Sequence, residues 1–319
     1  MKIVISELNW PVGIELLLQK GWKVIYDPNL WSDNVRLSRE LSDADALIVR
    51  NQTKVDKELL AHGGRLKVIG RLGVGLDNID LQFASAHDIP IVFAKNANAN
   101  SVAEYVVSAM LSYCRPLMEA ATDVKEGKWN RKRFTRVEIY GKTLGLIGYG
   151  DVGHRVAIRA KALGMTVLGY DPFVGAYDFA VTESGIRPAP LEQLYRSADF
   201  ISLHVPLTKQ TVNLIHEGAL QQMRPNVVLI NSSRGGIINE HDLHKALQQN
   251  TISGAFLDVL GQEPPEPDHP LLALDNCWIT PHIAGLTEES QVRTSEMVAT
   301  EVIRELEGTP SLCRVVTKL

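Results

Sequence analysis

The chain alternates short apolar runs with longer amphipathic segments over nearly all of its 319 residues, and this alternation constrains the fold more than any other feature. Runs rich in Val and Ile that are followed by Gly, Asp or Asn are typical of strands buried on both faces of a parallel sheet. In the first third of the chain, the expected strands are residues 3–5, 24–26, 46–49, 67–69 and 91–93. Between them lie expected helices such as residues 13–19, 56–61 and 81–86. This pattern predicts an α/β unit.

The same alternation starts again at Lys142 and predicts a second α/β unit. Its expected strands are residues 143–147, 166–170, 200–204, 227–231, 254–258 and 277–280, and its helices include residues 152–163, 191–197 and 240–249. A long helix, 101–117, is expected before this unit, with Ser101 as its N-cap and Glu104 completing a capping box. An amphipathic helix, 288–306, is expected after it. The length also favours two domains over one.

Composition and charge exclude several classes of protein. The net charge of −4 and the shortness of the one basic run, 131–133, argue against a nucleic-acid-binding surface. No apolar run approaches the length needed to span a bilayer. The three cysteines are far apart and form no C-x-x-C pair, so neither a metal site nor a disulfide framework is expected. These features, with an N-terminus that reads as a strand rather than a signal peptide, predict a cytoplasmic protein.

The strongest local motif is a G-x-G-x-x-G segment formed by Gly148, Tyr149, Gly150, Asp151, Val152 and Gly153. It follows an expected strand and opens an expected helix, and Asp171 ends the next strand about 20 positions later, the spacing of a dinucleotide fingerprint. Gly148 would permit the tight turn, Gly150 would let the backbone approach a pyrophosphate, and Gly153 would let helix and strand pack closely. The N–H groups and positive dipole end of the helix would face the phosphates.

Asp171 also predicts which dinucleotide binds. Its carboxylate would accept hydrogen bonds from the adenosine ribose hydroxyls and would repel the 2′-phosphate of NADP. Pro172 and Phe173 follow it, so no adjacent Arg is present to receive that phosphate. The sequence therefore predicts NAD as the cofactor.

Three further side chains follow strands of the second unit. Arg234 comes after strand 227–231, Glu263 after strand 254–258, and His282 after strand 277–280. In a doubly wound sheet the carboxyl ends of the strands line the ligand crevice, so a cation, a carboxylate and an imidazole are expected to meet beside the cofactor. Hydride chemistry on a 2-oxo acid needs a cation for the substrate carboxylate, a proton donor, and a group that holds this donor.

With these motifs, the sequence resembles the D-isomer-specific 2-hydroxyacid dehydrogenase family over nearly its whole length. The segments that carry the resemblance are 72–80, 100–104, 148–153 with Asp171, 204–206, 231–235 and 280–285. The resemblance implies a Rossmann-type doubly wound cofactor domain, 98–285, inserted into a flavodoxin-like α/β substrate domain made of residues 1–97 and 286–319. It also implies a homodimer formed through residues 101–140.

The resemblance implies roles for individual residues. His282 matches the catalytic acid/base, Glu263 the residue that orients it, and Arg234 the cation that binds the substrate. Backbone N–H groups around Val74 and Gly75 are expected to hold the substrate carboxylate. Further expected contacts, to the cofactor and on the substrate side, are His204, Val205, Pro206, Ser232, Ser233, Asp258, Gly285 and Asn98.

Among the subfamilies, the sequence is similar to short phosphoglycerate-dehydrogenase-like members, including sulfolactate dehydrogenases, through segments 49–53 and 70–73. Arg50 and Arg71 come just past two expected strands of the first unit, so they predict a substrate with a second anionic group. A glyoxylate or hydroxypyruvate reductase and a formate dehydrogenase are alternatives within the family. A non-catalytic NAD-sensing protein similar to transcriptional corepressors is an alternative of a different class.

Overall fold

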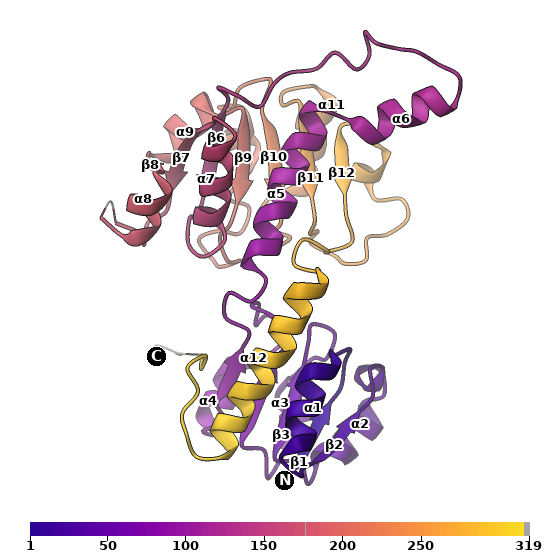
Figure 1. Cartoon of the computed structure of the whole chain (residues 1–319), viewed down its shortest axis with the longest axis vertical. Coiled ribbons are helices and arrows are strands. Elements are labelled where there is room, and N and C mark those ends of the chain that lie inside the picture. The colour runs from indigo at the N-terminus through magenta and orange to yellow at the C-terminus, as the bar shows by residue number, and fades with distance from the viewer. Residues whose placement is uncertain (176, 316–319) are drawn as a thin grey trace. The chain divides into compact units, whose positions relative to one another are not determined.

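In the computed structural model, which describes residues 1–175 and 177–315, the chain divides into two compact units. Unit 1 comprises Met1–Asn98 and the segment that begins at Leu286, and unit 2 comprises Ala99–Gly285. Unit 2 is therefore inserted into the sequence of unit 1. Each unit has a parallel sheet with helices on both faces (Figure 1). None of the described helices is both long enough and apolar enough to cross a membrane.

The sheet of unit 2 has seven parallel strands within the described residues, in the order β12-β11-β10-β9-β6-β7-β8. The strands are β6 (Thr143–Ile147), β7 (Thr166–Tyr170), β8 (Arg187–Pro188), β9 (Phe200–Leu203), β10 (Val228–Asn231), β11 (Gly254–Leu257) and β12 (Cys277–Ile279). The chain winds outward from β6 in one direction, then returns to β9 on its other side. This reversal is the Rossmann arrangement, so the fold predicted for the cofactor domain is confirmed.

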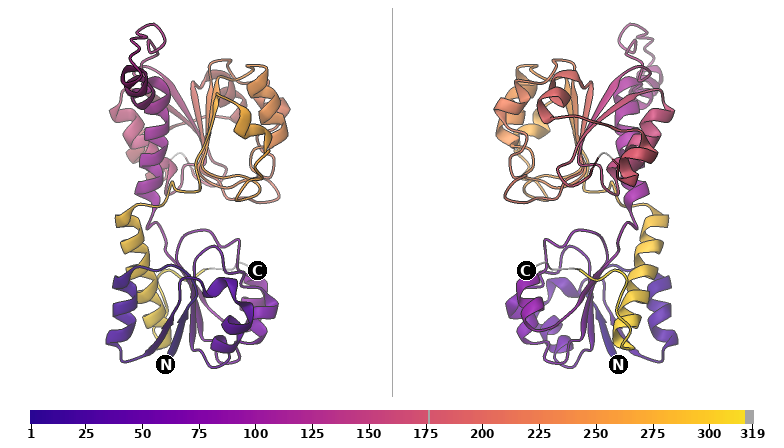
Figure 2. Two further views of the ribbon diagram at one scale, coloured as in Figure 1. Left: turned by 90° about the vertical axis from the view of Figure 1, so that its right-hand side faces the viewer. Right: turned by 90° about the vertical axis from the view of Figure 1, so that its left-hand side faces the viewer.

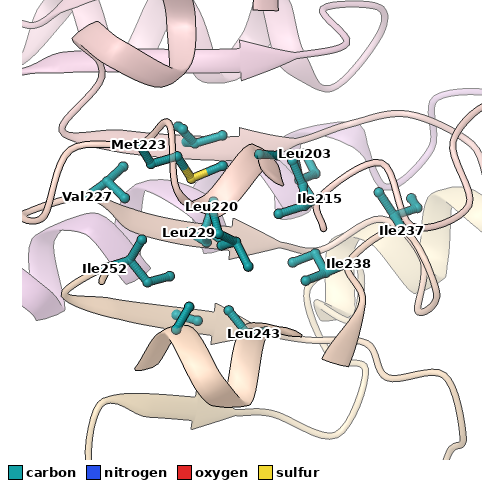
Figure 3. Packing of buried hydrophobic residues seen from close by; sticks show 14 of the residues in the cluster. Leu203, Ile215, Leu220, Met223, Val227, Leu229, Ile237, Ile238, Leu243 and Ile252 are labelled. Atoms are coloured by element: carbon teal, nitrogen blue, oxygen red, sulfur yellow. The ribbon is translucent and has the colours of Figure 1, made fainter. Parts of the chain in front are cut away.

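Helices cover both faces of this sheet (Figure 2). They are α5 (Ala99–Cys114), α7 (Gly153–Ala162), α8 (Phe179–Ser184), α9 (Leu191–Ser197), α10 (Glu217–Leu220) and α11 (Glu240–Gln248), with a short 3-10 helix, η2 (Pro270–Ala273). A further helix, α6 (Leu117–Lys125), follows α5 and contributes no side chain to the two described cores. One core holds buried side chains of α5 and α7, such as Met110 and Val156. The other holds side chains from β9, β10 and α11, such as Leu203, Leu229 and Leu243 (Figure 3).

The expected helix 101–117 was wrong at both ends. Helix α5 starts at Ala99, so Ser101 lies buried inside its first turns and is not the N-cap. It ends at Cys114 because Pro116 follows, and proline cannot continue a helix without losing a hydrogen bond. After this break the chain forms α6, a helix that the polar character of the segment did not predict.

The sheet of unit 1 has the order β2-β1-β3-β4-β5 and is parallel over its named strands. These are β1 (Lys2–Ile5), β2 (Lys23–Tyr26), β3 (Ala46–Val49), β4 (Val68–Arg71) and β5 (Ile91–Phe93). Helices α1 (Pro11–Gln19) and α12 (Glu288–Leu306) pack on one face. The other face is covered by η1 (Leu30–Ser32), α2 (Asn34–Leu41), α3 (Lys57–Ala61) and α4 (Leu81–Ala86). This strand order is that of flavodoxin, as predicted.

Candidate functional site

The strand order of unit 2 reverses between β6 and β9, and the ends of these two strands are in close contact. Gly148, which directly follows β6, has a φ of +84°. A β-carbon at this position would lie 2.5 Å from the carbonyl oxygen of His204, which follows β9. Only glycine therefore fits both the backbone conformation and the space. Ligands of doubly wound sheets bind at such a reversal point, which makes this crevice the candidate nucleotide site.

The glycine loop leaves room and hydrogen-bond donors for a phosphate group. No atom lies within 4 Å of where a β-carbon of Gly150 would be. In the described ranges, the N–H groups of Gly150, Asp151 and Val152 have no hydrogen-bond partner. They lie at the start of α7, where the helix dipole favours an anion. The Tyr149 side chain is buried in the core, so this residue could contact a nucleotide only through its backbone.

Asp171 lies beside this loop at the end of β7. Its Oδ2 accepts a hydrogen bond from the Tyr149 N–H at 3.1 Å, and its Oδ1 accepts one from the Phe173 N–H at 2.9 Å. Asp171 is half-buried, and an ionised carboxylate has about four acceptor positions, so it can still accept bonds from ribose hydroxyls. These residues fit the adenosine end of a dinucleotide.

Other predicted cofactor residues line the ends of β9 and β10. His204 is hydrogen-bonded to the Ser202 hydroxyl at 2.9 Å, and burial lowers the pKa of His204 to about 4, so its ring is neutral at neutral pH. Val205 packs against the core, and the Pro206 carbonyl accepts a hydrogen bond from Thr211 at 2.6 Å. The Ser232 hydroxyl is buried without a hydrogen-bond partner among the described residues, as expected of a group that meets a ligand.

Glu263 and His282 form the predicted carboxylate–imidazole pair. The His282 Nδ1 lies 2.7 Å from Glu263 Oε2, and the Leu260 N–H donates to Glu263 Oε1 at 3.1 Å. Burial alone would raise the pKa of Glu263, but its bond to His282, the Leu260 N–H and the charge of Arg234 together hold it below its usual value. Glu263 is therefore ionised at neutral pH. Since Nδ1 is engaged, Nε2 is the ring nitrogen of His282 that can exchange a proton with a substrate.

Asp258 holds the segment that carries His282. Its carboxylate, only 1% exposed, accepts hydrogen bonds from the Thr280 hydroxyl at 2.6 Å and from the N–H groups of Ile283 and Ala284 at 2.8 and 2.7 Å. Gly285, another predicted cofactor contact, comes next in the chain. Asp258 was predicted as a cofactor contact, and these three bonds give it a structural task that the sequence did not indicate.

The Arg234 loop is held by Asn231, the last residue of β10. The Asn231 side chain accepts hydrogen bonds from the N–H and hydroxyl of Ser233 at 3.1 and 2.7 Å, and it donates to the Arg234 carbonyl at 2.8 Å. A β-carbon on Gly235 would lie 1.9 Å from the Leu260 carbonyl oxygen. The Arg234 loop and the loop that leads to Glu263 are therefore packed backbone against backbone. An Asn at a strand end followed by Ser and Gly is the only sequence signal for this arrangement.

In unit 1, Arg50 begins a loop that is held by a buried carboxylate. Glu7, 1% exposed, follows β1 and accepts hydrogen bonds from the N–H groups of Arg50 and Thr53, both at 2.8 Å, and from the two residues between them. The Arg50 side chain is half-buried, with no hydrogen bond or ion pair to its guanidinium within residues 1–175 and 177–315. Burial lowers its pKa, and the charge of Glu7 opposes this.

Arg71 has a different environment from Arg50. It is the last residue of β4 rather than a residue past the strand, and it is 9% exposed. Its guanidinium donates to the Leu72 carbonyl at 2.5 Å and occupies the space where a side chain at Gly73 would lie. Arg71 thus supports the loop of Val74 and Gly75 from inside. Val74 is 43% exposed, Gly75 is half-buried, and the half-buried Asn98 ends the first part of unit 1.

Comparisons with known proteins agree with this geometry. Residues 107–284 match the model of the family described as "D-isomer specific 2-hydroxyacid dehydrogenase, NAD binding domain". This match covers the glycine loop, Asp171 and the Arg234, Glu263 and His282 positions. It confirms the NAD cofactor predicted from the glycine motif.

Full-length relatives and solved structures extend the likeness beyond the matched segment. The D-3-phosphoglycerate dehydrogenase of Archaeoglobus fulgidus is 40% identical over 310 residues, covering 97% of this chain and 58% of that protein. That of Methanocaldococcus jannaschii is 43% identical over 274 residues, covering 85% and 52%. The chain thus spans little more than half the length of these relatives. A crystal structure of Aquifex aeolicus D-lactate dehydrogenase with NAD and lactic acid is 30% identical, with a TM-score of 0.83 over 97% of this chain and 96% of that one.

The position of Asp171 predicts a preference for NADH over NADPH, measured as the ratio of kcat/KM values. Asp171→Ala should lower the efficiency with NADH by about tenfold or more, because a hydrogen bond to a charged group contributes about 1.5–3 kcal/mol. The kcat/KM with NADPH should change little or rise, so the ratio of kcat/KM with NADH to that with NADPH should fall. Asp268→Ala, in an exposed loop, is the matched control. Equal or better use of NADPH by the unaltered protein would contradict the role given to Asp171.

Proposed function

Because the chain belongs to the D-isomer-specific 2-hydroxyacid dehydrogenase family, we propose that it interconverts a D-2-hydroxy acid and the corresponding 2-oxo acid with NAD. The observation that carries this proposal is the 2.7 Å hydrogen bond between His282 and an ionised Glu263, with the charge of Arg234 acting on the same carboxylate. This set of a proton donor, its orienting group and a cation is what 2-oxo acid reduction requires.

The roles of the three residues follow from their chemistry. NAD supplies the hydride acceptor, and NADH the hydride donor, when bound at the glycine loop. Arg234 binds the substrate carboxylate, for which a planar guanidinium fork is well matched. In reduction, His282 donates the proton from Nε2 to the carbonyl oxygen, and in oxidation it accepts the hydroxyl proton. Glu263 keeps the ring oriented through Nδ1 and stabilises its positive charge.

We predict that His282→Ala loses about 10²- to 10⁴-fold in kcat, the usual contribution of a general acid–base group, while NADH still binds. Oxidation should be fastest at a higher pH than reduction, since oxidation needs the neutral ring and reduction the charged one. Glu263→Gln should lower kcat, because the neutral amide holds the charged ring less firmly through Nδ1 than the carboxylate does. Steady-state rates across pH and NADH fluorescence titrations measure these effects.

The matched control for these variants is His241→Ala, which removes an exposed histidine of α11. It should leave the rates and their pH dependence unchanged. Near-normal turnover by His282→Ala would refute the proposed mechanism. Absence of any NADH oxidation by the unaltered protein with glyoxylate, pyruvate, hydroxypyruvate, phosphohydroxypyruvate and sulfopyruvate would instead favour the NAD-sensing alternative.

The preferred substrate, in this proposal, carries a second anionic group such as a phosphate or a sulfonate. Arg50 supports this, because its half-buried guanidinium has no carboxylate partner in the described part of unit 1 and a substrate anion would supply one. The relatives named D-3-phosphoglycerate dehydrogenase agree with such a substrate. Arg71 supports the idea less, since it is buried and engaged with its own loop.

We expect Arg50→Ala to lower kcat/KM for phosphohydroxypyruvate or sulfopyruvate. The expected loss is equivalent to about 1.5–3 kcal/mol, the contribution of a hydrogen bond to a charged group. Hydroxypyruvate, which lacks the second anion, should change little. Arg39→Ala, an exposed arginine of α2 with a side chain that is 74% exposed, serves as the control. If the unaltered protein prefers hydroxypyruvate or glyoxylate, a glyoxylate or hydroxypyruvate reductase becomes the better assignment.

A homodimer through residues 101–140 is also part of the proposal. This segment exposes large apolar side chains, among them Leu117 at 68%, Met118 at 81% and Trp129 at 76%. Parts of α5 and α6 also line a cavity of about 1040 Å³ on unit 2. Exposed apolar side chains beside such a cavity favour a protein–protein contact, and a second copy with the same surface could cover them symmetrically.

Sedimentation measurements should therefore find a dimer. Met118→Asp with Leu117→Asp should shift it to a monomer, because a buried unpaired carboxylate at an interface is costly. Val35→Asp, an exposed position on α2, is the control. A monomeric unaltered protein, or a dimer that survives the double change, would count against this surface.

A cytoplasmic location stays a prediction from the sequence. The three cysteines, Cys114, Cys277 and Cys313, are free thiols in the structure. Burial raises the pKa of Cys277 to about 12, so this thiol stays protonated and unreactive at neutral pH. Free thiols agree with a reducing compartment.

A further inference from the structure

We propose that Tyr105 is a positioning residue for His282: through Thr280 and Asp258, its hydroxyl holds the backbone segment that carries the catalytic imidazole. The inference rests on the proposed function, in which His282 exchanges the proton. Tyr105 lies on α5 and precedes Thr280 by 175 positions in the sequence. All the residues of the network belong to unit 2.

The network has one possible direction. The Tyr105 hydroxyl lies 2.7 Å from the Thr280 hydroxyl, and the Thr280 hydroxyl lies 2.6 Å from Asp258 Oδ1. An ionised carboxylate only accepts, so Thr280 must donate its single proton to Asp258. Thr280 can then only accept from Tyr105, which is the donor at the start of the chain. Hydrogen bonds in such a chain polarise and strengthen one another.

The backbone at His282 needs this support. His282 has a φ of +55°, in the left-handed region that costs a non-glycine residue roughly 1–2 kcal/mol. Its N–H donates to the Thr280 carbonyl at 2.9 Å, and the next two N–H groups donate to the Asp258 carboxylate. Thr280 and Asp258 thus hold both sides of the strained residue. A strained conformation persists only where its surroundings determine it in this way.

The Tyr105 hydroxyl, rather than its ring, makes this contact. The Tyr105 ring packs against the core that Val106 and Met110 help to form, so the packing of the helix depends on the ring and not on the hydroxyl. Burial raises the pKa of Tyr105 to about 12, which keeps the hydroxyl protonated and donating throughout the working pH range. Phenylalanine at this position would retain the ring and lose only the donor.

Without the donor, the Thr280–Asp258 bond weakens and the His282 segment gains freedom. The ring then spends less time at 2.7 Å from Glu263 and in line with the substrate oxygen. Misplacement of a catalytic group lowers the rate of the chemical step, whereas the substrate carboxylate and the nucleotide still have their own binding groups. The effect should therefore appear in kcat, with KM and NADH affinity nearly unchanged.

The experiment compares Tyr105→Phe, Thr280→Val and Thr280→Ser in the full chain, with NADH and phosphohydroxypyruvate, hydroxypyruvate or sulfopyruvate as probes. We expect kcat to fall by about 5- to 50-fold in Tyr105→Phe and in Thr280→Val, less than the roughly 10²-fold that a 1 Å misplacement of a catalytic group can cost. Thr280→Ser keeps the hydroxyl and should restore most of the rate. The Tyr105→Phe, Thr280→Val double variant should be little slower than Thr280→Val, because residues of one network are not additive.

Tyr113→Phe is the matched control. Tyr113 is on the same helix and has aromatic contacts with Phe200 and Trp278. Its hydroxyl has no hydrogen bond among the described residues, so removal of this hydroxyl should leave kcat unchanged. Urea unfolding of each variant monitors stability.

A normal kcat in Tyr105→Phe while His282→Ala is inactive would overturn the inference and leave the proposed function intact. A loss of NADH affinity or stability with unchanged kcat would overturn it too, since Tyr105 would then only tie α5 to the sheet. Activity of His282→Ala would refute the proposed function itself.

Discussion

The Asp258 carboxylate is the group on which the geometry of the candidate site most depends. It is buried at the end of β11 and receives three donors from the segment after β12. A buried charge is tolerated only when hydrogen bonds replace its hydration, so the segment has little freedom to adopt another path. That path brings His282 to Glu263, and the Glu263 loop is itself packed against Gly235. One buried carboxylate thereby links the ends of three neighbouring strands.

The two units differ in whether the backbone N–H groups at the carboxyl ends of their strands have partners within the protein. In unit 1, the N–H groups of residues 50–53, which follow β3, all donate to the carboxylate of Glu7, an internal anion. In unit 2, the N–H groups around Gly150 and Asp151 are left without protein partners in the described chain. The same arrangement of donors is closed by a side chain in one unit and open to a phosphate in the other. This difference, more than the overall topology, makes unit 2 the nucleotide-binding unit.

Patterns among residues close in sequence predicted the features that depend on such residues, namely the strands and the glycine motif. The strands other than β8 (Arg187–Pro188) were found to within two residues, because apolar runs buried on both faces are distinctive, whereas β8 is short and exposed and was missed. The glycine motif with Asp171 was found because its residues lie close in sequence. Short helices such as α8 (Phe179–Ser184) and α10 (Glu217–Leu220) were missed, since helices of this length depend on tertiary packing. The contacts of Glu7 with residues 50–53 and of Tyr105 with Thr280 join distant parts of the chain, and no periodicity or spacing encodes them.

Arg50 and Arg71 show how equivalent sequence positions can become unequal in the fold. Both lie at the ends of adjacent strands and both were predicted to meet a second anion. Arg71 is buried and its guanidinium is used to support the loop of Val74, so its charge is committed within unit 1. The backbone of Arg50 is held by Glu7, which leaves the guanidinium half-buried and without a carboxylate among the described residues. A partly desolvated cation gains more from a ligand anion than an exposed one does. The proposed selectivity for a second anion therefore rests on Arg50, whereas Arg71 supports the loop of Val74 and Gly75 from within unit 1.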